Sequence, residues 1–205
     1  IDMTGGAKSG NSRGFAVDGS CLKVLSSSGT ITLRDRKPTG LTGSHTSLYL
    51  RPNTNDAIIF GADGSEIASS TSDVTIETDL YTFNGLTSKV NTSGAIRISP
   101  ISSSFSSGVS NANINISGSP SSLLIGKLDN SANVTISSDV SVAGPITIHG
   151  GVIDLNANIT STADGDIFIK GIASSNPSIE LKSGKTILKS AGTGTLTMQG
   201  HARVI

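Results

Sequence analysis

The chain has 205 residues, of which only 15 % are charged, and its 15 Lys and Arg residues balance its 15 Asp and Glu residues. This neutral balance offers no basic surface for nucleic-acid phosphates, and no run approaches the about 18 apolar residues that a membrane span needs. Aromatic residues make up 3 % of the chain, whereas the apolar 35 % lies in short Ile, Val and Leu runs. These runs predict a folded chain built from strands rather than a disordered one.

Triplets of the form apolar-x-apolar recur along the chain. Alternate side chains of a strand point to opposite faces, so each triplet directs its two outer side chains towards a core. The predicted strands contain residues 31–33, 48–50, 58–60, 74–76, 96–98, 114–116, 123–125, 134–136, 146–148, 153–155, 167–169, 179–181 and 196–198. Asp-Gly and Asn-Gly pairs at 63–64, 84–85 and 164–165 predict tight turns between them.

Two regions are less regular than the rest. Residues 1–29 carry few triplets, and residues 99–110 are rich in Ser. Because triplets resume at Ile114 without a change of composition, we interpret residues 99–110 as an enlarged loop or an irregular coil rather than a linker. We expect residues 1–205 to form a single β-solenoid segment of a larger protein.

The spacing of the triplets, about ten or about twenty residues, is compatible with sandwiches, barrels and solenoids. A sandwich core about 10 Å thick needs large, often aromatic side chains. A narrow coil can instead be filled by aliphatic side chains that stack on identical side chains above and below. The sequence therefore predicts an all-β parallel β-helix (β-solenoid) of roughly ten coils spaced by about 4.8 Å, with an antiparallel β-sandwich as the alternative.

The second half of the chain resembles a known family. The segments SLLIGK (122–127), SANVTI (131–136), VAGPITIHGG (142–151), IDLNANITST (153–162) and GDIFI (165–169) resemble the repeat region of filamentous-haemagglutinin-type adhesins, which are exported by two-partner secretion. GAIRISP (94–100) resembles the segment that commonly precedes this block. The resemblance covers residues 94–205 well and the first half only in style, through SLYLRP (47–52), and the Asn-Pro-Asn-type secretion signature of the family is absent.

This resemblance implies a right-handed parallel β-helix within the shaft of a secreted or surface-attached bacterial adhesin. It implies no catalytic residue and no cofactor. The expected partners are flanking segments of the same long chain and a host-cell or environmental glycan or protein. Unpaired strand edges at the ends of a solenoid also predict end-to-end self-association.

The alternative of a carbohydrate-active β-helix enzyme, a polysaccharide lyase or hydrolase, requires carboxylates clustered on neighbouring coils. The nearest candidates are Asp63, Glu66, Glu77 and Asp79. Asp63 belongs to a turn signature, and solvated turn carboxylates explain these residues without chemistry. We therefore expect no enzyme, and keep a β-sandwich binding module as a second alternative.

No metal site is expected. His45, His149 and His201 are far apart, lack zinc-ligand spacing and stand beside turns or at strand ends, which favours imidazoles that face solvent. Residues 61–66 and 164–166 contain oxygen ligands but follow no calcium-loop pattern. The single Cys21 cannot form an internal disulfide.

Two sets of surface residues are candidates for contact or modification. If the module binds directly, we expect the longest outward side chains to contribute, namely Tyr49, Arg51, Tyr81 and Arg97. Four Asn residues satisfy the Asn-x-Ser/Thr acceptor pattern for glycosylation, namely Asn91, Asn115, Asn133 and Asn158.

Overall fold

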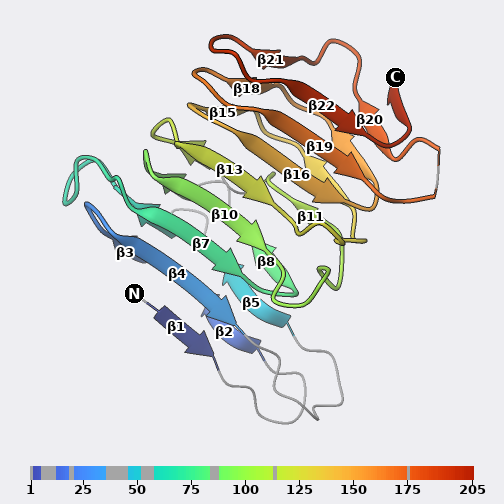
Figure 1. The fold of residues 1–205 in the computed structure, drawn as a ribbon. Helices are drawn as coiled ribbons and strands as arrows, with labels where there is room; N and C mark the ends of the chain where they lie inside the picture. The colour runs from blue at the N-terminus through green and yellow to red at the C-terminus, as the bar shows by residue number, and fades with distance from the viewer. Residues whose placement is uncertain are drawn as a thin grey trace.

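The computed structural model describes residues 2–5, 13–18, 21–35, 46–51, 58–83, 88–112, 115–174 and 176–205. These residues form an all-β parallel solenoid, in which the chain winds upwards and lays each strand beside its counterpart in the coil before (Figure 1). The predicted parallel stacking is confirmed, and the antiparallel sandwich is excluded for the described strands, whose pairings are all parallel. The same residues contain no helix that could cross a membrane.

Among the described residues, every third strand belongs to one sheet of eight strands, here called the continuous sheet because it runs from the first described strand to the last coil. Its strands are β1 (Asp2–Gly5), β4 (Thr30–Asp35), β7 (Asp73–Glu77), β10 (Ala95–Ser99), β13 (Ser122–Ile125), β16 (Ile146–Gly150), β19 (Ile167–Gly171) and β22 (Leu196–Gln199). We number the coils one to eight by these strands. The described strands make eight coils rather than the expected ten or so, because some coils are longer than twenty residues, most of all the one from β4 to β7.

The other two faces of the solenoid are each divided into two sheets. The second face holds β2 (Arg13–Asp18), β5 (Thr46–Arg51) and β8 (Tyr81–Phe83), then β11 (Val109–Ser110), β14 (Val134–Ile136), β17 (Ile153–Leu155), β20 (Ile179–Leu181) and β23 (Ala202–Val204). The third face holds β3 (Leu22–Leu25), β6 (Ile58–Gly61), β9 (Lys89–Asn91) and β12 (Asn115–Ser117), then β15 (Val140–Val142), β18 (Ile159–Ser161) and β21 (Ile187–Lys189).

A seam therefore crosses the solenoid around coil four. Within the described residues, no ladder joins β8 to β11 on the second face or β12 to β15 on the third face. The continuous sheet passes both breaks, through β7, β10 and β13, whereas β9 and β12 pair at the level of the first break and β11 and β14 pair at the level of the second. Residues 100–108, inside the Ser-rich stretch, connect β10 to β11 at the seam and place Phe105, 4 % exposed, in the core.

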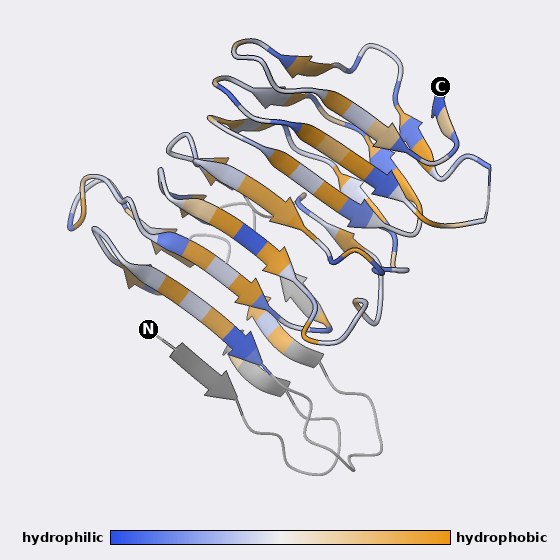
Figure 2. Ribbon diagram, in the orientation of Figure 1, coloured by the Kyte–Doolittle hydropathy of each residue, from blue (hydrophilic) through white to orange (hydrophobic). Residues whose placement is uncertain are grey.

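The core consists of aliphatic stripes that run along the stack. From coil two to coil eight, the register of the continuous sheet places one inward residue directly over the next, in the order Ile31, Val74, Ile96, Leu123, Ile146, Ile167 and Leu196. All of these except Leu196 are at most 1 % exposed, and the matching hydrophobic bands appear on successive strands in Figure 2. Burial of each such side chain is worth about 1.5–3 kcal/mol, and it is achieved only when the next coil is in place.

Candidate functional site

The predicted contact residues lie on two different faces. Arg97 is exposed on β10 of the continuous sheet, where its Nε donates to Ser99 Oγ at 3.3 Å. Tyr49 is half-buried on β5 of the second face. The side chains of Arg51 and Tyr81 lie outside the described part, although the ladder pairs Tyr81 with Leu48, a core position. Arg97 is thus on a different sheet from the other three.

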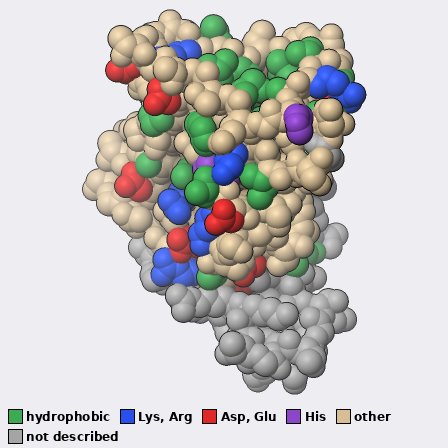
Figure 3. Space-filling view, turned by 45° about the vertical axis from the view of Figure 1, so that its right-hand side comes forward, with side chains coloured by type: hydrophobic (Ala, Val, Ile, Leu, Met, Phe, Trp, Pro, Cys, Tyr) green, Lys and Arg blue, Asp and Glu red, His purple; other side chains and the backbone are tan. Residues whose placement is uncertain are grey.

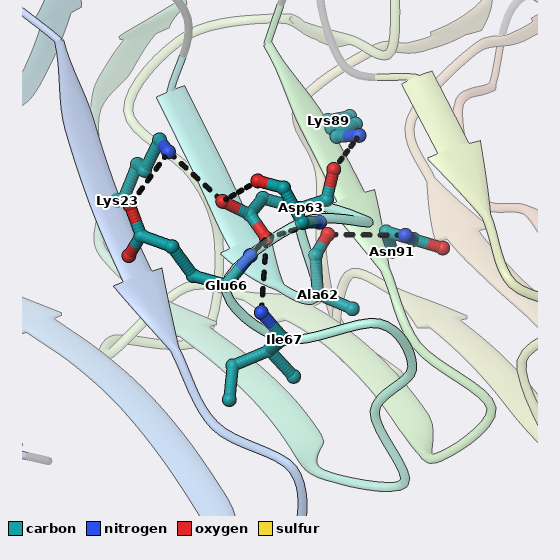
Figure 4. A network of polar contacts seen from close by, with 8 residues as sticks. Lys23, Ala62, Asp63, Glu66, Ile67, Lys89 and Asn91 are labelled. Atoms are coloured by element: carbon teal, nitrogen blue, oxygen red, sulfur yellow. Dashed lines mark hydrogen bonds and ion pairs between the residues drawn. The ribbon is translucent and has the colours of Figure 1, made fainter.

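Asp63 is the centre of a polar network on the third face (Figure 4). Its Oδ1 accepts hydrogen bonds from the backbone N–H groups of Ser65, Glu66 and Ile67 at 3.0, 2.9 and 3.1 Å. Its Oδ2 accepts one from Lys23 Nζ at 2.8 Å, and Lys23 also contacts Glu66 Oε1 at 3.2 Å. The carboxylate of Asp63 therefore closes its own turn and ties it to the coil below.

The same turn is held from the coil above. Lys89 Nζ donates to the carbonyl of Asp63 at 3.5 Å, and Asn91 Nδ2 donates to the carbonyl of Ala62 at 3.0 Å. Lys23 and the backbone donors hold the pKa of Asp63 well below its ordinary range, and Asp63 raises the pKa of Lys23. A carboxyl group that stays ionised in this way is suited to structural pairing, whereas a general acid needs a raised pKa.

The other two candidate carboxylates are also occupied. Glu77 Oε2 pairs with Arg34 Nε of the preceding strand of the continuous sheet. Asp79 Oδ1 accepts from both the N–H and the Oγ of Ser102 at 2.8 Å, which anchors the start of the Ser-rich connection. Asp63 and Glu66 thus share Lys23, Glu77 and Asp79 each have a partner of their own, and all four carboxylates are engaged in contacts between coils. In the described ranges, no group of three or more His, Cys, Asp and Glu side chains is placed to hold a metal ion.

An open depression lies beside the turns of coils seven and eight. It is lined by Asp164, Gly165, Asp166, Thr193 and Gly194. Asp164 Oδ1 accepts from the N–H groups of Thr193 and Gly194 at 2.9 and 3.2 Å, and Asp166 Oδ1 accepts from Thr195 N–H at 2.7 Å. These donors lower the pKa of both carboxyl groups. The oxygens that suggest a calcium loop in the sequence are used to bind the next turn.

His149 differs from the expectation of a solvent-facing imidazole. It lies on the outward side of β16, yet it is only 9 % exposed, because Phe168 of the next coil packs edge-to-face with it at a centroid distance of 5.7 Å. Its Nδ1 has no hydrogen-bond partner. The sequence carries a signal for this contact. Aligning GPITIHG (144–150) with GDIFIKG (165–171) pairs Thr147 with Phe168, and this register places the Phe168 ring diagonally beside the outward side chain of His149. His201 is exposed, as expected, and His45 lies outside the described residues.

The four predicted acceptor Asn residues occupy different environments. Nδ2, the atom that a glycan would modify, is engaged in Asn91 by the Ala62 carbonyl and in Asn158 by Asp139 Oδ2 at 3.2 Å. Asn133 is exposed, and its Oδ1 accepts from Val152 N–H at 3.0 Å. Asn115 is exposed on β12. Asn133 and Asn158 thus act as ladder residues that bond one coil to the next.

Exposed apolar side chains gather on the last coils. Leu188, Leu196, Val204 and Ile205 are between 48 and 67 % exposed, and Figure 3 shows hydrophobic side chains grouped in the upper part of the view.

Comparisons of the chain with protein-family models, with curated proteins and with solved structures found no match.

Proposed function

We propose that this chain is a non-enzymatic shaft module of a large secreted or surface-attached bacterial adhesin of the filamentous-haemagglutinin type. The observation that carries the proposal is the continuous sheet, in which an aliphatic stripe keeps its register through successive coils. Such a stack forms a long, stiff rod, because each coil packs on the coil before it and on the coil after it.

The outward side of the sheet supports the same role. Its central row holds four Thr residues, which suit outward strand positions, and three larger residues, Arg97, Leu124 and Phe168. Of Trp, Tyr and Arg, the residues that dominate tight protein contacts, this described row contains Arg97 alone. Turn carboxylates and amides form hydrogen bonds between coils, as at Asp63 and Asn158. The partners under this proposal are flanking segments of the same chain, with a weakly bound glycan or protein and end-to-end self-association as further contacts.

A distance measurement tests the shaft role. Cys21, the single cysteine, is exposed just before β3, and Ser183 is exposed in the turn between β20 and β21, six coil steps away. Spin labels on Cys21 and on a Ser183→Cys replacement are expected to give one narrow distance distribution near about 30 Å, from a strand spacing of about 4.8 Å. A broad distribution at neutral pH contradicts a rigid shaft.

The parent chain, labelled only at Cys21, is the matched control. Any dipolar signal from it reports contact between molecules and measures self-association separately. Adhesive function is tested by binding of the chain to glycan arrays and to cells, with Arg97→Ala as the first variant. Hydrolysis or cleavage of a polysaccharide by the purified chain would contradict the proposal and favour the β-helix enzyme.

A further inference from the structure

A buried side chain joins coil four, at the seam, to the two coils above it. Asn130, 0 % exposed, follows β13, and its Oδ1 accepts from Phe105 N–H at 3.1 Å and from Ser104 Oγ at 3.0 Å. Its Nδ2 donates to the carbonyl of His149 at 2.8 Å. Asn130 thus joins the Ser-rich connection of coil four, its own coil five, and the end of β16 in coil six.

His149, whose carbonyl accepts the Asn130 bond, has an imidazole Nδ1 without a hydrogen-bond partner. On one side, β19 contributes the Phe168 ring and Lys170, which the ladder pairs with His149. On the other side is Gly126, where a Cβ would come within 2.3 Å of the His149 carbonyl, so that no side chain fits there.

The other charged groups near this junction do not compensate a cation on His149. Lys127, next to Gly126, directs its Nζ to the carbonyls of Ile101 and Ser102 at 2.7 and 2.8 Å. Asp129 is exposed in the turn that precedes Asn130. Lys170 is the charged side chain that acts electrostatically on the imidazole, and its charge has the same sign as the imidazolium.

We propose that the seam of this solenoid opens reversibly on mild acidification, and that protonation of His149 is the trigger. Protonation places an N–H at Nδ1, where no acceptor is present, inside a contact with Phe168 and beside the ammonium of Lys170. The imidazolium is better hydrated when the ring leaves this contact. Because the His149 carbonyl holds Asn130, displacement of the end of β16 releases the bonds to Ser104 and Phe105.

The direction of the pH effect follows from the environment. Burial, and then Lys170, lower the pKa of His149 below its ordinary value, which is about 6.5 in an unfolded chain. A group whose pKa is lowered on folding binds its proton better in the open state. The stabilisation of the seam by neutral His149 is therefore complete above about pH 6.5 and is lost as the pH falls below that value.

Hydrogen exchange measured by mass spectrometry at pH 7.5 and pH 5.0, corrected for the intrinsic rate, tests this proposal on the whole chain. We expect a severalfold and reversible loss of protection at pH 5.0 in peptides that cover residues 100–110, 126–133 and 146–151. His149→Phe keeps a ring against Phe168 but cannot titrate, and it should abolish the loss. His149→Asn serves the same purpose if the Phe variant does not fold.

His201→Asn is the matched control, since it removes an exposed histidine and should leave the acid response as in the parent chain. Equal loss of protection in the parent and in the His149 variants would overturn the proposal, as would unchanged protection of the seam in the parent chain. The acid response does not depend on the shaft role. A shaft that is rigid at neutral pH with an unresponsive seam refutes only this inference.

Discussion

The two halves of the solenoid share one core but close their coils differently. In the N-terminal half, β4 begins at Thr30 and β7 only at Asp73, and the long connection 62–72 is fixed by the Asp63 network. In the C-terminal half, β16 begins at Ile146 and β19 at Ile167, and short turns are each bonded to the next coil by a side chain such as Asn158 or Asp166.

This difference shows which part of the structure is fixed by stacking and which part is free to vary. The inward stripe is equally buried in both halves, at Ile31 as at Ile146. Extra residues are accepted outside the stripe when a side chain satisfies the backbone groups that they add, because unpaired buried groups are costly. The core therefore sets the repeat, and polar side chains set the length of each coil.

Truncating a side chain of the aliphatic stripe should lower the free energy of unfolding most, and by the same amount in both halves. Ile31→Ala and Ile146→Ala, at 1 and 0 % exposure, should each lower the free energy of unfolding by about 2–4 kcal/mol. Leu196→Ala, at 48 % exposure in the last coil, should cost less than about 1 kcal/mol. Urea denaturation measures all three. A much smaller loss for Ile31→Ala than for Ile146→Ala would show that the halves unfold separately.

Removing the Asn130 side chain should have the next largest effect, because it acts where the halves meet. Asn130→Ala leaves Phe105 N–H and the His149 carbonyl without their partner, which should cost about 2–3 kcal/mol. Asn130→Asp retains the acceptor for Phe105 but turns a buried carboxylate oxygen towards the His149 carbonyl, so it should be at least as harmful at pH 7. Two separate unfolding transitions in Asn130→Ala would sharpen the comparison further, whereas an unchanged midpoint would show that the strand ladders hold the seam without Asn130.

The stack could be predicted from the sequence because its cause is local. Alternation in 123–125, 146–148 and 167–169 marks strands, and an almost wholly aliphatic inward set fits a narrow coil better than a sandwich. Pairs of residues on different coils were harder to predict. Asn130 reads as a turn residue in the sequence, and its burial depends on Phe105 from another coil. The burial of His149 likewise depends on the register that brings Phe168 beside it.

Acid should weaken the Asp63 network of the N-terminal half before it affects the aliphatic stripes of the core. Asp63 has a lowered pKa in the folded chain, so its stabilising contribution is present above the unfolded value of about 3.9 and is lost as the pH falls below it. Asp63→Asn should lower stability at pH 7 and flatten the dependence on pH below about 4. Exchange of residues 62–72 reports the effect locally. An unaltered pH profile in this variant would show that the Asp63 carboxylate does not stabilise the N-terminal half.

The smallest effect concerns the second face of the C-terminal half, where two acidic residues share a ladder. Asp154 pairs with Glu180 of the next coil, and burial, followed by the charge of Glu180, raises the pKa of Asp154. Because ionisation is disfavoured in the folded chain, Asp154→Asn should stabilise the protein by about 0.3–0.5 kcal/mol at pH 7, a value that allows for solvent screening. The gain should vanish below about pH 4, where Asp154 is protonated in both states.

Asp139→Asn is the matched comparison for that small gain, since bonds from Asn158 lower the pKa of Asp139. It should destabilise the protein at pH 7, so the two replacements are expected to move the melting temperature in opposite directions. If both raise it, general relief of negative charge explains the gain. If they diverge as expected, the polar side chains between coils act through their individual partners, which is the feature that distinguishes the short-turn half from the half held by the Asp63 network.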